Sequence, residues 1–389
     1  MRLNRSDRSQ LSDWWFTIDR LMLSAILLLM IGGLVLSLAA SPSVAERLGY
    51  DTLHFFRRHA IVLVPALLLL FFSSLLDPRM IRRASLILFV AGIALMVATL
   101  LFGPETKGAT RWLKFGALSV QPSEFVKPAF VVLSAWFFAE SRRVKDMPSL
   151  HIAIAFYAVF VILLILQPDF GQALLMTLVW AGLFFMAGMP LFWVFILAGG
   201  VLVAIVVAYL TLPHVAERIE GFFDPGAAAG YQMRRAIESF TSGGWFGKGP
   251  GEGMVKQQLP DSHSDFIFAV IAEEFGLVAC LGVAALFAFI ILRGLMRAAS
   301  RRDEFVRYAT AGLMILFGLQ ALINMGVNVG LLPAKGMTLP FLSYGGSSLL
   351  SMALAMGFAL GLTRRRPETS RSRTARDASD TGLSHGAEA

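Results

Sequence analysis

The sequence has too little charge for a water-soluble protein. Only 15% of its 389 residues are charged and 56% are apolar, whereas soluble domains carry roughly 25% charged residues. Its single cysteine, Cys280, excludes an internal disulfide, a cysteine-rich zinc site and a CxxC redox pair. The sequence also contains no HExxH metal motif and no GxSxG nucleophile motif. This composition predicts an all-α polytopic membrane protein.

Ten apolar runs have lengths typical of membrane helices, which need about 20 mostly apolar residues. The first run is longer than the roughly 7–15 residues of a signal-peptide core, so we expect it to be retained as a helix. The ten expected spans are 21–40, 60–76, 84–102, 125–139, 152–166, 173–189, 191–212, 266–292, 308–332 and 347–362.

The arginine pairs between the runs predict the orientation of the chain. The pairs Arg82-Arg83, Arg142-Arg143 and Arg301-Arg302 all fall in short loops on the same side as the N-terminus. Because basic residues concentrate in short cytoplasmic loops, both termini are expected in the cytoplasm. The net charge of +8 then reflects topology and contact with anionic lipid, and nucleic acid is not an expected partner.

The expected organisation is one membrane domain, residues 21–362, with two polar ends. Residues 1–20 form a cytoplasmic segment in which Trp14-Trp15-Phe16 indicates an interfacial helix. Residues 363–389 are rich in Arg, Ser, Thr and Asp and are expected to be a disordered cytoplasmic tail. The long outer loop 212–264 separates spans seven and eight. Its segment 231–240 has helical character, and a loop of this length is usually functional or disordered, so function is expected on the outer side.

The motif LPDSHSDFIF places Asp265 at the expected outer start of the eighth span. A carboxylate there is suited to cap the helix N-terminus. With His263 and Asp261 in the same turn, it is also a candidate acid–base group, and the two roles are compatible. Glu273 and Glu274 follow two turns deeper in the span, where at least one should face inward because lipid exposure of a charge is costly.

The motif QPSEFVK contains Gln121, Ser123, Glu124 and Lys127. Ser123 is placed to cap the fourth span after a proline. Glu124 and Lys127 are three residues apart, so they share one helix face and can form an ion pair. Charged residues in a membrane helix usually face the bundle interior or a cavity. The alternative is a structural ion pair near the interface, where long side chains reach water easily.

Two motifs in other outer segments also carry polar groups. In GATRWLKFG, Arg111 and Lys114 flank Trp112, an arrangement that suits a phosphate next to a sugar ring. The alternative is a solvated loop with an interfacial tryptophan. In QPDFG, Asp169 lies in a tight turn between two spans. It either belongs to a site or bonds its own turn backbone.

Two glycine-rich segments complete the candidate regions. GGWFGKG resembles a phosphate-binding loop but lacks its spacing and its Ser or Thr, although Lys248 could still meet an anion. LLPAKGMTLPFLSYGGSS, which contains Lys335 and Ser343, joins the last two spans. Non-helical backbone at membrane depth is tolerated only against protein or water, so this segment is expected to line a cavity.

Taken together and in this order, these motifs resemble the SEDS family (shape, elongation, division and sporulation) over about residues 20–362. The segment PAKGMTLP is more similar to the division members than to the elongation members. The resemblance implies a peptidoglycan glycosyltransferase with ten spans that polymerises lipid II outside the bacterial inner membrane, at the division septum. It also implies partners: a growing lipid-linked glycan, a class B penicillin-binding protein (the division transpeptidase), other divisome membrane proteins, and membrane lipids.

The resemblance also assigns roles to residues. Asp265 matches the essential acidic residue, and we expect it to act as general base for the GlcNAc 4-hydroxyl, with inversion and undecaprenyl pyrophosphate as leaving group. Glu124 and Lys127 match a charged pair, and Trp112 and Asp169 match other functional positions. The expected cation pool for the pyrophosphate is Arg111, Lys114, Lys127, Arg234, Arg235, Lys248 and Lys335. Gln121, Ser123, His263 and Ser343 complete the expected substrate-binding residues.

No cofactor is required by these motifs, although a divalent cation (Mg or Mn) could share the pyrophosphate charge. Three other functions stay open: an elongation-type polymerase with the same chemistry, a lipid II flippase, and a non-catalytic division scaffold. A flippase would need charged groups across the whole membrane depth, whereas the charges of this sequence cluster near one face.

Overall fold

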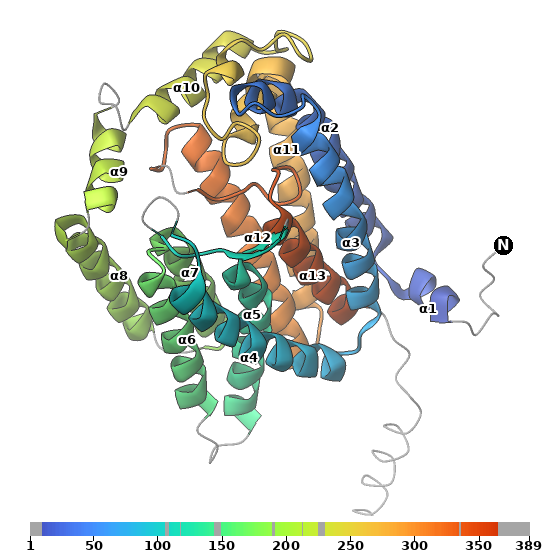
Figure 1. Cartoon of the computed structure of the whole chain (residues 1–389). Helices are drawn as coiled ribbons and strands as arrows, with labels where there is room; N and C mark the ends of the chain where they lie inside the picture. The colour runs from blue at the N-terminus through green and yellow to red at the C-terminus, as the bar shows by residue number, and fades with distance from the viewer. Residues whose placement is uncertain are drawn as a thin grey trace, which may run out of the picture.

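The computed structural model describes residues 10–105, 109–116, 118–143, 149–188, 191–211, 213–224, 230–333 and 336–364. They form a bundle of long helices with one two-stranded antiparallel sheet (Figure 1). In chain order the elements are α1 (Gln10–Thr17), α2 (Arg20–Arg47), α3 (His54–Leu75), α4 (Pro78–Phe102), β1 (Leu113–Phe115), β2 (Leu118–Val120), α5 (Pro122–Arg143), α6 (Ser149–Leu166), α7 (Phe170–Met186), α8 (Leu191–Thr211), α9 (Pro213–Phe223), α10 (Tyr231–Gly243), η2 (Val255–Gln257), α11 (Ile267–Ala299), α12 (Glu304–Asn328) and α13 (Gly346–Thr363).

Each of the ten expected spans overlaps one helix, α2 to α8 and α11 to α13, although α11 is broken at Gly276. Within the described ranges, seven helices are long and apolar enough to cross a membrane, and α7 is apolar but shorter. Apolar side chains such as Ile61 and Ile87 are exposed on the outside of the bundle, as expected when the surrounding solvent is lipid. The all-α polytopic membrane fold is therefore confirmed.

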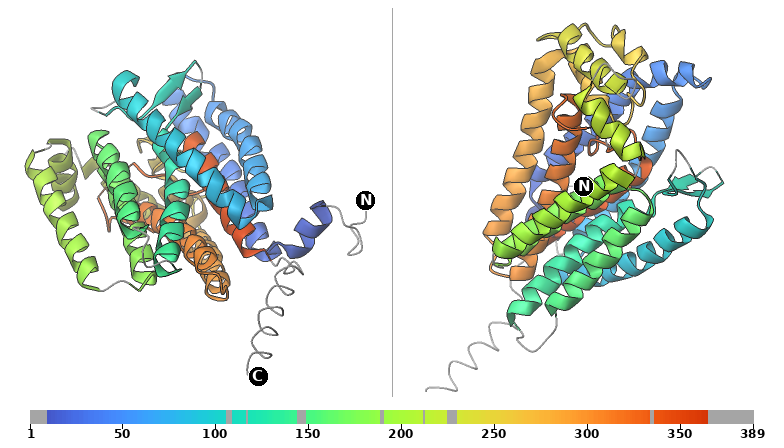
Figure 2. Two further views of the ribbon diagram at one scale, coloured as in Figure 1. Left: turned by 90° about the horizontal axis from the view of Figure 1, so that it is seen from below. Right: turned by 90° about the vertical axis from the view of Figure 1, so that its left-hand side faces the viewer.

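The helices α12 and α13 form the centre of the bundle. Their membrane-spanning windows are 78% and 83% buried, compared with 28% for α4. Figures 1 and 2 show them surrounded by the other helices. The polar residues that α12 and α13 carry therefore face other helices and not lipid.

The helix α11 is broken at Gly276, whose backbone (φ 79°, ψ 179°) is not helical. Cys280 Sγ lies 3.9 Å from the carbonyl oxygen of Phe268, although twelve residues of straight helix would span about 18 Å. The segment 267–275 therefore folds back along the segment after Gly276. The expectation of one continuous eighth span from residue 266 is wrong, because a left-handed glycine reverses the chain.

The loop 243–249, which contains the GGWFGKG motif, is inserted at this break. A break leaves helix carbonyls and amides without their usual partners, and the loop backbone supplies replacements. Gly247 is required there, since a Cβ at this position would lie 2.2 Å from the carbonyl oxygen of Glu274. The replacement hydrogen bonds run from Lys248 N to Glu273 O (2.9 Å), Gly249 N to Glu274 O (3.0 Å), Leu277 N to Gly244 O (2.9 Å) and Val278 N to Trp245 O (3.2 Å).

Two predicted surface helices are present. α10 covers the predicted helical segment 231–240 and packs against α11 at the end of the bundle that carries the inserted loop (Figure 1). α1 contains Trp14, whose indole N–H donates to Ser74 Oγ on α3 (2.8 Å). The location of α1 at the membrane surface stays a prediction, as do the orientation of the chain and the character of the tail, most of which lies outside the described residues.

Candidate active site

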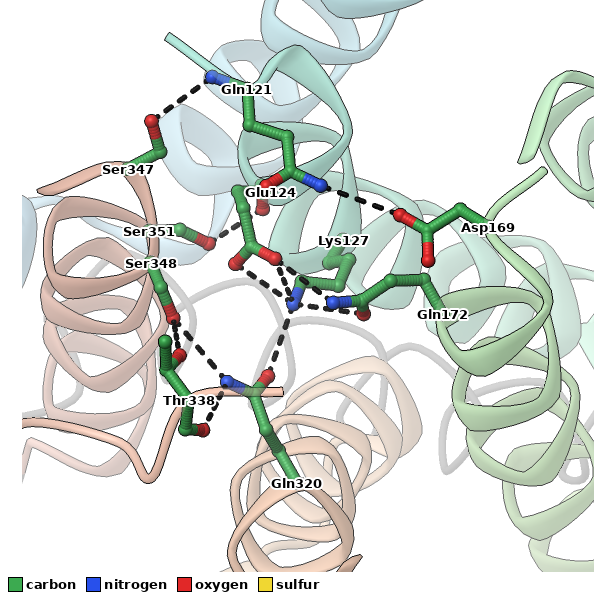
Figure 3. Close-up of polar contacts among 10 residues, drawn as sticks. All are labelled: Gln121, Glu124, Lys127, Asp169, Gln172, Gln320, Thr338, Ser347, Ser348 and Ser351. Carbon is green, nitrogen blue, oxygen red and sulfur yellow. Dashed lines mark hydrogen bonds and ion pairs between the residues drawn. The ribbon is translucent and has the colours of Figure 1, made fainter. Parts of the chain in front are cut away.

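The centre of the bundle holds a buried ion pair on α5, shown in Figure 3. Lys127 Nζ lies 2.8 Å from Glu124 Oε2, and the two residues are 1% and 3% exposed. The ammonium group also donates to Gln172 Oε1 on α7 (3.2 Å) and to Gln320 Oε1 on α12 (3.0 Å). An ammonium group has three donors, and here protein acceptors on three helices occupy them. The predicted ion pair is confirmed, and its location in the middle of the bundle shows that it ties these helices together.

Serines at the start of α13 extend this cluster. Ser351 Oγ donates to the backbone carbonyl of Glu124 (2.6 Å). Gln320 Nε2 donates to Ser348 Oγ (3.3 Å) and to the carbonyl of Thr338 (3.2 Å). The cluster therefore reaches the α12–α13 loop (residues 329–345), as Figure 3 shows. These partners of the ion pair were not predicted from the sequence.

The start of α5 differs slightly from the prediction. The helix begins at Pro122, so Ser123 lies buried in the first turn and does not precede the helix as a cap. Gln121 precedes the helix, and its backbone N–H donates to Ser347 Oγ on α13 (3.0 Å). Its side-chain amide donates to Asp169 Oδ2 (3.4 Å). Gln121 thus connects α13 with the turn before α7.

Arg111 holds the turn between α6 and α7. Its guanidinium group donates to the carbonyl oxygens of Gln167 (3.1 Å) and Pro168, and Nη1 lies 3.7 Å from Asp169 Oδ1. Asp169 is buried, and burial raises the pKa of its carboxyl group although the charge of Arg111 opposes that shift. All three guanidinium nitrogens therefore have partners in this turn. Both interpretations of Asp169, site residue and turn residue, are compatible with this position.

Lys114 and Trp112 follow Arg111 at the edge of the bundle. Trp112 is half-buried and Lys114, on β1, is exposed. Lys114 lines a cavity of about 660 Å³ whose other walls are apolar. The remaining lining residues are Leu95, Ala98, Phe102, Pro104 and Leu113.

Asp265 is held through its backbone. Its carbonyl oxygen accepts hydrogen bonds from Asn324 Nδ2 (2.8 Å) and Asn328 Nδ2 (3.0 Å), both on α12. Its own N–H donates to the carbonyl of Asp261 (3.0 Å). The residue is partly exposed, and its side chain lies next to the α12–α13 loop, because a Cβ on Gly336 would be 3.5 Å from Asp265 Oδ2. The structure therefore brings together two motifs that are about 70 residues apart in the sequence.

His263 packs in an aromatic pocket beside Asp265. Its ring centroid is 4.4 Å from that of Phe55 and 5.5 Å from that of Tyr344, and its carbonyl accepts the N–H of Tyr344 (2.9 Å). Burial lowers the pKa of His263 to about 4, so the imidazole is neutral at pH 7. Ser343 Oγ accepts the N–H of Leu339 (2.8 Å) and so stabilises the α12–α13 loop.

One face of α12 links the ion pair to Asp265. Gln320, Asn324 and Asn328 are spaced by four residues and therefore lie on the same side of the helix. Gln320 binds Lys127, and the two asparagines bind the carbonyl of Asp265. Sequence reasoning missed these residues. Three carboxamides at this spacing in an otherwise apolar span would have revealed them, since polar residues in a membrane helix usually face other helices.

The glutamates of α11 have a different location from the one predicted. Both are fully buried, which confirms that they face inward, but they bind the preceding loop and do not lie deeper than Asp265 in a continuous span. Glu273 accepts the backbone N–H groups of Val255 (2.7 Å) and Lys256 (2.8 Å). Lys256 Nζ, which was not predicted, binds Glu274 and the carbonyl of Ala39. The reversal at Gly276 is the reason for this difference.

The other predicted cations lie in the inserted loop, on α10 or outside the described residues. Lys248 is 37% exposed, with Nζ 3.9 Å from Glu273 Oε1. On α10, Arg234 is exposed and Arg235 pairs with Glu238. Lys335 lies outside the described residues. In the part of the chain that the structure describes, no group of three His, Cys, Asp or Glu residues is placed to hold a metal ion.

Comparisons with known proteins identify the family of the chain. The family model for FTSW_RODA_SPOVE, described as cell cycle protein, matches residues 19–367. A probable peptidoglycan glycosyltransferase FtsW of Caulobacter vibrioides is 45% identical over 364 residues, covering 93% of both chains. A protein of the same name from Pseudoalteromonas translucida is 34% identical over 351 residues, covering 87% of each.

Two solved structures have the same fold. One, described as structural coordination of polymerization and crosslinking by a peptidoglycan synthase complex, is 26% identical with a TM-score of 0.73, covering 90% of this chain and 98% of that chain. The rod shape determining protein RodA of Thermus thermophilus is 25% identical with a TM-score of 0.68, covering 91% and 99%. The chain belongs to the FtsW/RodA/SpoVE family of cell cycle proteins.

Proposed function

We propose that this member of the FtsW/RodA/SpoVE family is a peptidoglycan glycosyltransferase that polymerises lipid II for the septal wall during cell division. The observation that carries the proposal is the placement of Asp265. Its carbonyl is fixed by two asparagines, its carboxylate lies beside Gly336, and the residue is partly exposed. An ionisable residue inside a membrane bundle generally marks a functional site, and the similarity to relatives named FtsW supports the reaction.

In the proposed reaction, Asp265 is the general base. It takes the proton from the 4-hydroxyl of the GlcNAc of one lipid II as that oxygen attacks the anomeric carbon of the MurNAc on the growing lipid-linked strand. The bond from that carbon to the pyrophosphate oxygen breaks, so the configuration inverts and undecaprenyl pyrophosphate leaves. A base in this role must come within about 2.6–3.2 Å of the hydroxyl, which requires a carboxylate that substrate can reach.

The leaving pyrophosphate requires positive charge. Lys114 fits this role because its ammonium group borders an apolar cavity, which suits an anionic head group attached to a polyprenyl chain. Arg234, Lys248 and Lys335 are further candidates. Arg111 and Lys127 are engaged by protein acceptors, so we assign them, with Glu124 and Gln121, to positioning the α6–α7 turn and the helices around the site.

Two further parts of the proposal concern the sugar and metal ions. Trp112, next to Arg111 in the chain, is proposed to pack against a sugar ring. Participation of Mg or Mn is tested by adding EDTA and then restoring each metal. Loss of polymerisation that either metal restores would support it.

The proposed setting is the outer face of the bacterial inner membrane at the septum, with a class B penicillin-binding protein as partner. The fold similarity to a chain of a complex that coordinates polymerization and crosslinking supports such a partner. Lipid II, the growing glycan, other divisome membrane proteins and membrane lipids are the remaining proposed partners. Joint purification with the division transpeptidase and, separately, with the elongation transpeptidase would distinguish the two cellular roles.

Polymerisation of fluorescent lipid II by the purified protein with its transpeptidase tests the proposal. The transpeptidase serine is blocked so that only glycan chains form. We expect chains from the wild type and none from Asp265→Ala, provided that the variant binds its partner and unfolds at the wild-type temperature. Equal product from both would overturn Asp265 as base and favour Glu124 or Asp169. No product from either, together with lipid II transfer across vesicle membranes, would favour a flippase.

A further inference from the structure

The side chain of Asn328 is inserted between the backbones of Asp265 and Ala269. Asn328 Nδ2 donates to the carbonyl of Asp265 (3.0 Å), and Asn328 Oδ1 accepts the N–H of Ala269 (3.0 Å). In a continuous α-helix the carbonyl of residue 265 would accept the N–H of residue 269 directly. One carboxamide from α12 therefore binds both groups of the hydrogen bond that would extend α11 backwards to Asp265, and the N–H of Ala269 is shared with the carbonyl of Phe266 (3.1 Å).

Asn324 completes the arrangement from the preceding turn of α12. Its Nδ2 atom donates to the carbonyl of Asp265 (2.8 Å) and also to the carbonyl of Met337 (2.6 Å). The two acceptor positions of the Asp265 carbonyl are thus occupied by two asparagines. The same side chain fixes the α12–α13 loop that borders the carboxylate of Asp265.

The backbone conformation agrees with this interpretation. α11 begins at Ile267, and Phe266 before it has φ −112° and ψ 25°, outside the helical range. Three consecutive N–H groups, those of Ser264, Asp265 and Phe266, converge on the carbonyl of Asp261. The chain therefore forms a tight turn up to residue 266. It becomes helical only from Ile267, after the Asp265 carbonyl that Asn328 binds.

We propose that Asn328 and Asn324 are positioning residues that keep the peptide of Asp265 out of the first turn of α11 and so direct its carboxylate toward the α12–α13 loop. This inference rests on the proposed function, in which Asp265 is the general base. Without Asn328, the carbonyl of Asp265 and the N–H of Ala269 can bond to each other, so both groups stay satisfied. The carboxylate then rotates with the new helical turn, and catalysis falls while the fold is retained.

Asn328→Ala tests the proposal in the lipid II polymerisation assay. We expect kcat to fall about 100-fold, which is the loss associated with a misplacement of roughly 1 Å, while KM stays within about threefold. The matched control is Thr310→Val, which removes a buried hydroxyl from the same helix, far along the chain from both asparagines. It should retain wild-type kcat. Unfolding temperatures of all variants show whether the fold is kept.

Asn328→Asp is the second variant, because the protonation state of the introduced carboxyl group can be changed with pH. As a protonated acid it can donate to the carbonyl of Asp265, whereas its carboxylate repels that oxygen. The ratio of its kcat to the wild-type kcat should therefore rise as the pH is lowered. If Asn328 only held helices together, this ratio would not follow pH.

The outcomes separate this inference from the assignment of Asp265. Wild-type activity in Asp265→Ala would remove the general base and the proposed mechanism with it. If that variant is inactive but Asn328→Ala keeps at least half of the wild-type kcat, or loses activity through KM alone, the base assignment stands and the positioning role is wrong. If Asn328→Ala does not fold, a flat pH ratio for Asn328→Asp overturns the proposal.

Discussion

Glu124 and Asp265 are both acidic groups inside the helical bundle, but the protein holds them in opposite ways. Glu124 is held by its carboxylate, which binds Lys127 and Gln172 and is almost fully buried. Asp265 is held by its backbone carbonyl, its carboxylate lies beside a glycine, and the residue is partly exposed. Bonds to the charged group itself suit a structural role, whereas bonds to the backbone carbonyl fix the position of a residue that stays partly exposed.

The sharpest test of this difference is Asp265→Asn. The amide has nearly the same shape but cannot accept a proton, and general-base catalysis contributes about 10²–10⁴-fold to a rate. We expect kcat to fall by about that factor, with stability within about 0.5 kcal/mol of the wild type because the backbone bonds stay. Steady-state polymerisation and thermal unfolding in the same detergent measure both quantities. A large loss of stability would place Asp265 in the same class as Glu124.

Lys127→Met should give the reverse pattern, with the main effect on stability. The substitution leaves Glu124 buried without its cation, and breaking a buried ion pair in this way costs about 3–5 kcal/mol. Equilibrium unfolding in mixed detergent micelles measures the change. The double variant Glu124→Gln with Lys127→Met removes both charges and should recover most of the lost stability. No recovery in the double variant would contradict a structural role for the pair.

Gly276→Ala tests how far Asp265 depends on the shape of its segment. An alanine Cβ would lie 2.3 Å from the carbonyl oxygen of Trp245, at a φ of +79°, and a non-glycine residue in such a conformation is destabilised by about 1–3 kcal/mol. We expect reduced stability and reduced kcat together. Gly282→Ala is the control, since nothing lies within 4 Å of its Cβ position. Equal kcat and equal stability of the Gly276→Ala and Gly282→Ala variants would show that the chain reversal at Gly276 does not position Asp265.

The smallest expected effect is on the pH dependence of stability and comes from His263, the neutral neighbour of Asp265. Its pKa is lowered to about 4 by burial, with Asp261 raising it and Arg47 lowering it further. Because the folded-state pKa lies below the usual histidine value of 6.5, the unfolded chain binds the proton first as the pH falls. The wild type should therefore lose stability as the pH falls from 6.5 toward 4. His263→Phe, which keeps the ring packing with Phe55 and Tyr344, should lack this loss. If the free energy of unfolding changes with pH in the same way for both proteins between pH 7 and 4, protonation of His263 does not destabilise the fold.

Local sequence signals predicted much of the fold. The ten apolar runs overlap ten helices, of which only α11 is broken within the described residues, and the segment 231–240 is helical. These features were predictable because hydrophobicity and helical periodicity depend on neighbouring residues. The ion pair of Glu124 and Lys127 was also predictable from a spacing of three. The sequence did not predict the small sheet β1–β2, whose strands have three residues each.

Features that depend on distant residues were missed. Gly276 lies within an apolar run, where a single glycine does not predict a reversal of the chain. The reversal depends on the loop 243–249, which replaces the missing helix bonds. Likewise, Lys256 and Glu274 form a buried pair only because the chain turns back at Gly276. For the same reason the depth predicted for Glu273 and Glu274 was wrong.

The contacts from α12 and α13 also determine when the site forms during biosynthesis. Glu124 and Lys127 are synthesised early, but their partners Ser351 and Gln320 follow more than 190 residues later in the chain. The carbonyl of Asp265 likewise gains its hydrogen bonds only after Asn324 and Asn328 have been synthesised. A ribosome-bound chain that ends before α13 therefore has no assembled site. We therefore expect that the proposed reaction requires insertion of the last helix and that chains ending before α13 are inactive.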